Sequence, residues 1–139
     1  MKFEDFIKKG DAKHTFPDTQ LAKALLGTAR QDLVFLKSIK LDNISARKMV
    51  SNFYDVLRSL LEAGATLEGF KIYSHEAFTY YLLEKGQENA SRKFERFRKV
   101  RNSINYYGKD IDVKEAAELI DEMKYLINEM VSALEAKIK

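Results

Sequence analysis

The sequence contains no cysteine and no tryptophan, only six glycines, and a single proline at position 17. Without cysteine the chain can form neither a disulfide nor a thiolate metal site. His14 and His75 are the only histidines, so a His-rich metal site within one chain is not expected. A Gly-rich phosphate loop is also missing. We therefore expect neither a metal nor another cofactor.

Long apolar runs are missing as well. No segment approaches the roughly 18 apolar residues that indicate a membrane span. The N-terminal stretch MKFEDFIKKGDAK carries acidic residues and has no apolar core of signal-peptide length. We therefore expect a soluble, cytoplasmic protein that has no membrane partner.

Charge is nearly balanced over the chain, with 24 basic and 21 acidic residues and a net charge of +3. Such a balance does not by itself indicate a nucleic-acid-binding protein. The distribution is more informative, because six of the ten residues from Arg92 to Arg101 are basic and only Glu95 is acidic. The positive charge is concentrated in one segment, which we predict to be helical.

Apolar residues recur at three- and four-residue intervals through most of the chain, which predicts helices. We predict them over about residues 18–39, 45–62, 74–83, 90–106 and 113–138, and we expect Ala63–Ala65 to be a fraying end or a kink. Short turns between long amphipathic helices predict an all-α, antiparallel up-and-down bundle of about five helices. Four of them would form the core, one would be short, and the C-terminal helix would be long.

The domain organisation predicted from this pattern is simple. Residues 1–17 form an N-terminal arm, and residues 18–139 form a single bundle domain. Phe3, Phe6 and Ile7 give the arm a small apolar face that could dock on the bundle.

The segment RKVRNSINYYGKD, residues 98–110, combines basic, amide and phenol side chains at the end of a predicted helix. Arg98 and Arg101 are three residues apart and therefore share a helix face. A guanidinium suits a phosphate group, and neutral hydrogen-bonding groups surround it in sequence. The candidate phosphate- or nucleotide-binding residues are Arg98, Arg101, Asn102, Asn105 and Tyr107. Arginine near a helix end and Gly108 as a stop signal would also occur in an ordinary helix terminus.

His75 follows Ser74, which we predict to cap the short helix. Imidazole titrates near neutral pH, so His75 could support the site as a proton carrier. A helix-start residue whose ring bonds to a neighbour is the interpretation that we favour.

The stretch from Arg101 to Tyr106 resembles the signature of the HEPN family (higher eukaryote and prokaryote nucleotide-binding domain). That signature reads Arg-Asn, three residues, then His, and here Tyr106 fills the histidine position. ARKMVSNFYDVLRSLLEA (46–63) and KIYSHEAFTYYLLEKG (71–86) resemble the second and third helices of the family. The resemblance covers roughly residues 18–135.

The resemblance implies a helical bundle that dimerises with a second copy. Arg101 would contact phosphate, Asn102 would orient the site, and Arg101 and Tyr106 would be the catalytic candidates. It also implies a nucleotide or RNA ligand and a protein partner such as a minimal nucleotidyltransferase, as in two-component toxin–antitoxin systems. Since the reference pKa of tyrosine is about 10, Tyr106 is a poor general base.

Three functional hypotheses follow from the sequence. The first is a HEPN-like module that binds nucleotide or RNA phosphate and a protein partner. The second is a metal-independent endoribonuclease that uses Tyr106 or His75 for proton transfer. The third is a purely structural helical protein whose last helix assembles with a partner.

Overall fold

A computed structural model describes residues 1–138 and shows the predicted all-α bundle with its long C-terminal helix. Within these residues lie six helices and one two-stranded sheet. The elements in chain order are α1 (Phe3–Lys8), β1 (Ala12–His14), α2 (Thr19–Lys37), α3 (Ala46–Leu67), β2 (Phe70–Ile72), α4 (His75–Glu84), α5 (Glu88–Tyr107) and α6 (Val113–Ile138). No helix in the described part of the chain is long and apolar enough to cross a membrane.

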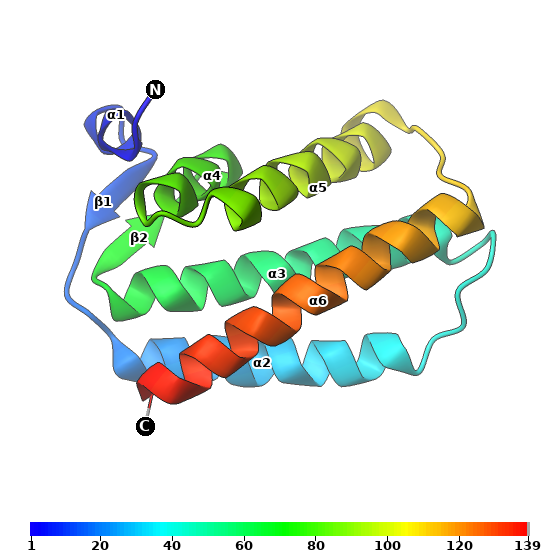
Figure 1. Ribbon diagram of the computed structural model, residues 1–139, viewed down its shortest axis with the longest axis horizontal. Coiled ribbons are helices and arrows are strands. Elements are labelled where there is room, and N and C mark those ends of the chain that lie inside the picture. The colour runs from blue at the N-terminus through cyan, green and yellow to red at the C-terminus, as the bar shows by residue number, and fades with distance from the viewer. Residues whose placement is uncertain (139) are drawn as a thin grey trace.

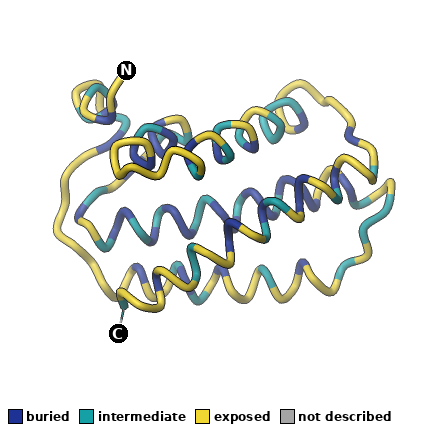
Figure 2. Tube along the Cα trace, viewed as in Figure 1, coloured by how far each residue is buried: buried dark blue, intermediate teal, exposed yellow. Residues whose placement is uncertain are grey.

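Helix α3 is the centre of the bundle. It packs against α2, α5 and α6, and α6 runs across one side of it (Figure 1). Buried and half-buried residues follow one another along almost its whole length (Figure 2). A helix surrounded in this way normally carries apolar side chains on most of its faces. Polar residues on α3 therefore need an explanation.

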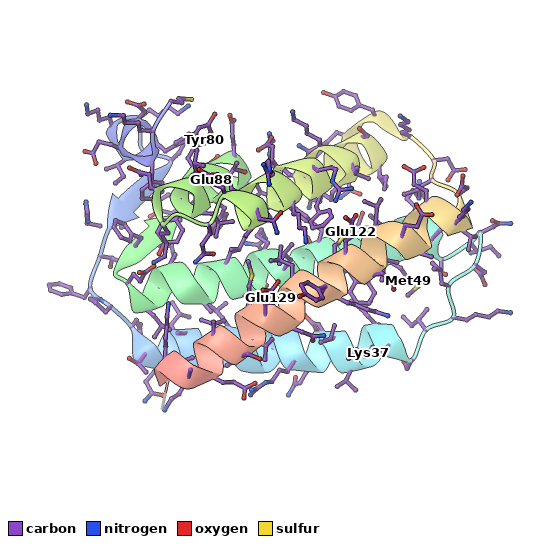
Figure 3. The ribbon with its side chains drawn as sticks, viewed as in Figure 1. Lys37, Met49, Tyr80, Glu88, Glu122 and Glu129 are labelled. Carbon is purple, nitrogen blue, oxygen red and sulfur yellow. The ribbon has the colours of Figure 1, made fainter. Side chains whose placement is uncertain are left out.

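Helix α5 lies on the other side of α3 from α2 and packs on α4 and α3 (Figure 1). Its link to α6 includes an ion pair, since Arg96 Nη2 lies 2.7 Å from Glu122 Oε1, and Glu122 is labelled on α6 in Figure 3. Lys93 Nζ also lies 5.5 Å from the ring centre of Tyr125. These two contacts connect α5 with α6.

The N-terminal arm is an integral part of the fold. Its short helix α1 buries Phe3 and Phe6, and the ring of Phe6 lies 5.1 Å from that of Tyr80. Strand β1 pairs antiparallel with β2, placing Ala12 opposite Ile72. The sequence did not predict this sheet, because a three-residue strand is too short to show an alternating pattern.

The main differences from the predicted helix boundaries have local causes. Helix α3 continues without a break through Ala63, Gly64 and Ala65 to Leu67. Both alanines are buried, and Gly64 lies beside Leu134 of α6. This stretch is therefore a close packing contact rather than a frayed end or a kink.

The predicted helix signals at Ser74 and Gly108 are confirmed, and a further cap lies at Asp18. Asp18 Oδ1 accepts a hydrogen bond from Leu21 N at 3.0 Å, and Ser74 Oγ accepts one from Ala77 N at 3.3 Å. Gly108 ends α5 with φ of +62°, a left-handed conformation that glycine adopts without steric cost. These caps fix the start of α4 and the end of α5, which carry candidate residues.

The docking of the arm leads to a testable prediction. Replacing the fully buried Phe6 by alanine should lower the free energy of unfolding by about 3–5 kcal/mol, because the core loses a ring and gains a cavity. Phe16→Ala is the matched control, since Phe16 lies in the same arm and is 90% exposed. Urea unfolding of both variants provides the measurement. Equal stabilities would show that the arm does not contribute to the bundle core.

Candidate phosphate-binding site

One face of the central helix α3 is polar. Ser51, Asn52, Asp55, Arg58 and Glu62 recur at three- and four-residue intervals, which places them along one side of the helix. All five are buried or half-buried. These polar groups are therefore partly shielded from water, and those that are buried need a partner, since unpaired polar groups are costly in a buried position.

Arg101 of α5 lies against this polar face. Its side chain is only 16% exposed, and Nη2 lies 3.7 Å from Oδ1 of Asp55. Nη1 donates a long hydrogen bond of 3.4 Å to the hydroxyl of Tyr106. The guanidinium carbon lies 5.4 Å from the ring centre of Tyr54 and 5.8 Å from that of Tyr106. Aromatic rings thus flank the positive charge and favour it electrostatically.

The hydrogen-bonding capacity of Arg101 is largely unused. A guanidinium offers five N–H donors. Nε of Arg101 is buried and has no hydrogen-bond partner within residues 1–138, and its contacts to Asp55 and Tyr106 are both long. Buried donors are satisfied in most proteins, so an exception calls for an explanation such as a bound ligand.

His75 is the first residue of α4 and lies close to the same arginine. Its Nδ1 is 2.9 Å from the hydroxyl of Tyr54. Burial, together with the positive charges of Arg58, Arg101 and Arg98, lowers the pKa of His75 to about 4. His75 is therefore neutral at pH 7. Burial also raises the pKa of Tyr54, which keeps the phenol protonated.

Three arginines act by their charge on both Tyr54 and His75. We call these residues, Arg58, Arg98 and Arg101, the arginine cluster. Arg58 Nη1 bonds to Glu62 Oε2 at 3.2 Å on the same helix.

Arg98 pairs with Glu95, which also accepts a hydrogen bond of 2.8 Å from Thr79. Burial would raise the pKa of Glu95, but the bonds from Arg98 and Thr79 outweigh it and hold the pKa below its usual value. Arg98 is thereby fixed in place, whereas Arg101 retains free donors.

The structure brings together only part of the residue set predicted from the sequence. Arg98, Arg101, Tyr106 and His75 lie in one region. Asn105 points to α3 instead, where its Oδ1 accepts a hydrogen bond of 2.9 Å from Ser51.

Two other candidates do not join this region. Tyr107 is 83% exposed. Asn102 is half-buried, and its side chain forms no hydrogen bond to any of residues 1–138. The geometry therefore supports a smaller site than the sequence motif predicts.

The structure adds three residues that the sequence analysis did not identify. Tyr54, Asp55 and Arg58 come from α3 and contact His75 or Arg101, or act on them through charge. The sequence signal was weak, because Asp55 and Arg58 lie between the apolar positions of an amphipathic helix. Such residues are interpreted as an exposed face by default, and only the folded arrangement shows that Asp55 lies 3.7 Å from Arg101 of α5.

Two hollows lie along the polar face of α3. The larger, of about 440 Å³, is bordered by Arg47, Lys48, Ser51, Asn52, Asp55, Ile104 and Asn105. The smaller, of about 260 Å³, lies between α2 and α3 and is bordered by Asp32, Phe35, Leu36, Asn52 and Asp55. Since Asn52 and Asp55 border both, the hollows are adjacent, and the contact of Asp55 with Arg101 connects them to the arginine cluster.

No group of three histidine, aspartate or glutamate side chains in residues 1–138 is arranged to hold a metal ion. Comparisons with protein-family models, curated proteins and solved structures found no match for the chain. The function must therefore be inferred from the geometry of the arginine cluster and from the motif resemblance.

The environment of His75 predicts a specific loss of stability in acid. The unfolded chain binds a proton at His75 below its ordinary pKa of about 6.5, whereas the folded protein binds it only near pH 4. Stability due to neutral His75 is thus present above pH 6.5 and is lost as the pH falls toward 4. His75→Gln should weaken this loss, measured as the change in urea unfolding free energy between pH 7 and 4.5.

His14→Gln is the matched control for this experiment, because His14 is exposed on β1. It should retain the pH dependence of the wild-type protein. A His75→Gln variant with the same pH dependence as the wild type would contradict the proposed burial and charge environment of His75.

Proposed function

We propose that the chain is a HEPN-like module that binds the phosphate of a nucleotide or of RNA at the arginine cluster. The observation that carries this proposal is the guanidinium of Arg101, which is mostly buried, lies between two aromatic rings and keeps a buried donor without a partner. The outer Nη groups, whose contacts to Asp55 and Tyr106 are long, could donate to a phosphate oxygen. Charge-assisted bonds of this kind are about twice as strong as bonds between neutral groups.

The charge balance around the site supports an anionic ligand. Arg58 and Arg98 each have a carboxylate partner within 3.5 Å on their own helix, but the carboxylate of Asp55 lies 3.7 Å from Arg101. Burial raises the pKa of Asp55, against the opposing charges of Arg101 and Arg58. Asp55 therefore neutralises Arg101 only weakly. A phosphate group could complete the coordination of Arg101 without displacing a strong ion pair.

The remaining parts of the proposal rest on the motif resemblance. They are a protein partner, namely a minimal nucleotidyltransferase in a two-component toxin–antitoxin system, and a homodimeric state. Symmetric dimers are the commonest oligomers of soluble proteins.

A metal-independent endoribonuclease is the second candidate function. It is favoured by the position of His75. The imidazole of His75 is neutral at pH 7, and the positive charges of Arg58, Arg98 and Arg101 all act on it. In the tautomer whose Nδ1–H donates to Tyr54, Nε2 has a lone pair that can accept the proton of an attacking 2′-hydroxyl. Tyr106, which touches Arg101, could protonate the leaving 5′-oxygen.

Arg101→Ala tests the binding proposal. It should weaken binding of a fluorescently labelled single-stranded RNA by roughly 10- to 100-fold at low salt, because charge-assisted hydrogen bonds to phosphate are lost. The slope of log affinity against log salt concentration should also decrease in magnitude by about one, which corresponds to the loss of one phosphate contact. Fluorescence anisotropy provides both readouts.

Arg92→Ala is the matched control, because Arg92 is an exposed arginine on the same helix, outside the cluster. It should change the affinity far less than Arg101→Ala. Equal effects of the two substitutions would show that binding depends only on general surface charge and would contradict the proposal.

Incubating the same RNA with the protein in EDTA separates the two candidate functions. Cleavage by the wild-type protein that is lost in both Arg101→Ala and His75→Gln supports the ribonuclease, and intact RNA supports binding alone.

A further inference from the structure

The smaller hollow shares Asp55 with the proposed phosphate site, but the rest of its lining has no role there. It lies between α2 and α3, and its polar lining consists of two carboxylates, Asp32 and Asp55, and one amide, Asn52. Phe35 forms an aromatic edge and is 62% exposed. The hollow thus offers hydrogen-bond acceptors and an aromatic face next to the proposed phosphate-binding residue.

We propose that this hollow is a base-recognition subsite for guanine, formed by Asp32, Asn52 and Asp55 with Phe35 at its edge. The proposal rests on the phosphate-binding function proposed above and specifies the base attached to that phosphate. Its volume of about 260 Å³ lies just below the range of about 300–1,000 Å³ typical of small-molecule sites. A single base is smaller than the ligands of most such sites.

The hydrogen-bonding groups favour guanine over the other bases. The Watson–Crick edge of guanine presents two adjacent donors, N1–H and the 2-amino group, beside the acceptor O6. An ionised carboxylate only accepts hydrogen bonds and can bind two adjacent donors at once. The amide nitrogen of Asn52 can donate to O6. Adenine and cytosine place an acceptor beside a single amino group, and uracil places its N–H between two carbonyls, so none of them matches a carboxylate in this way.

The two carboxylates differ in their availability. Asp55 is near Arg101 and partly committed to it at 3.7 Å. Asp32 is exposed on α2 and forms no ion pair with any of residues 1–138. Both carboxylates border the hollow, and the charge of Asp32 acts on Asp55. Asp32 is therefore the residue whose removal tests base recognition without disturbing the arginine cluster.

Phe35 supports the same interpretation. It is a large aromatic side chain that α2 directs away from the bundle core, at the border of the hollow. Base–aromatic stacking is common in the recognition of single-stranded nucleic acids and is tolerant of sequence. Phe35 should therefore contribute to the binding of every base, whereas Asp32 should contribute to the preference for guanine.

Calorimetric titration with the four 5′-ribonucleoside monophosphates tests the subsite. The wild-type protein should bind GMP at least about fivefold more tightly than AMP, CMP or UMP, in line with the discrimination that paired hydrogen bonds provide. Asp32→Asn should remove this preference and leave the affinity for AMP unchanged. Asp121→Asn is the control, since it makes the same change at an exposed position on α6. Phe35→Ala should weaken all four nucleotides by a similar factor.

The outcomes distinguish this proposal from the one on which it rests. No binding of any nucleotide or single-stranded RNA would contradict the phosphate site itself. Equal affinities for all four nucleotides, or a GMP preference that survives in Asp32→Asn, would overturn the guanine subsite and leave the phosphate site standing. A trinucleotide with guanine between two adenines, compared with the all-adenine trinucleotide, shows whether guanine is recognised within RNA as well as in the free nucleotide.

Discussion

The guanidinium of Arg101 lies against the polar face of α3, and both proposed binding sites depend on this contact. A mostly buried positive charge lies between α3 and α5 with fewer acceptors than it has donors. A buried hydrogen-bond donor without a partner is costly, so a protein that retains such an arrangement gives up stability unless a ligand compensates for it. Functional sites are where such costs are commonly found. The arginine cluster fits this description better than any other part of residues 1–138.

The other elements of the fold position the residues that form this contact. Helix α3 supplies Tyr54, Asp55 and Arg58, and α5 brings Arg101 against them. Pairing of β1 with β2 fixes the chain just before α4, and α4 begins with His75. The N-terminal arm therefore contributes to the position of the imidazole although it lies outside the site (Figure 1).

Long amphipathic helices and their caps could be predicted from the sequence because each carries a periodic apolar pattern and a local stop or start signal. The sheet of β1 and β2 could not, since its strands are three residues long and are held by tertiary contacts. Arg101 and Tyr106 stood out because they belong to a local motif. Arg58 and Asp55 did not, because the contact of Asp55 with Arg101 and the effect of Arg58 on His75 arise only in the folded protein.

The most direct test of phosphate binding at the arginine cluster is NMR spectroscopy of the His75 imidazole during titration with GMP. A bound phosphate would offset the charges of Arg58, Arg98 and Arg101, so the pKa of His75 should rise from about 4. The signal of His14, which is exposed on β1, serves as an internal reference. A rise in the pKa of His75 that is absent in Arg101→Ala would confirm the account. An unchanged pKa in the presence of saturating ligand would contradict it.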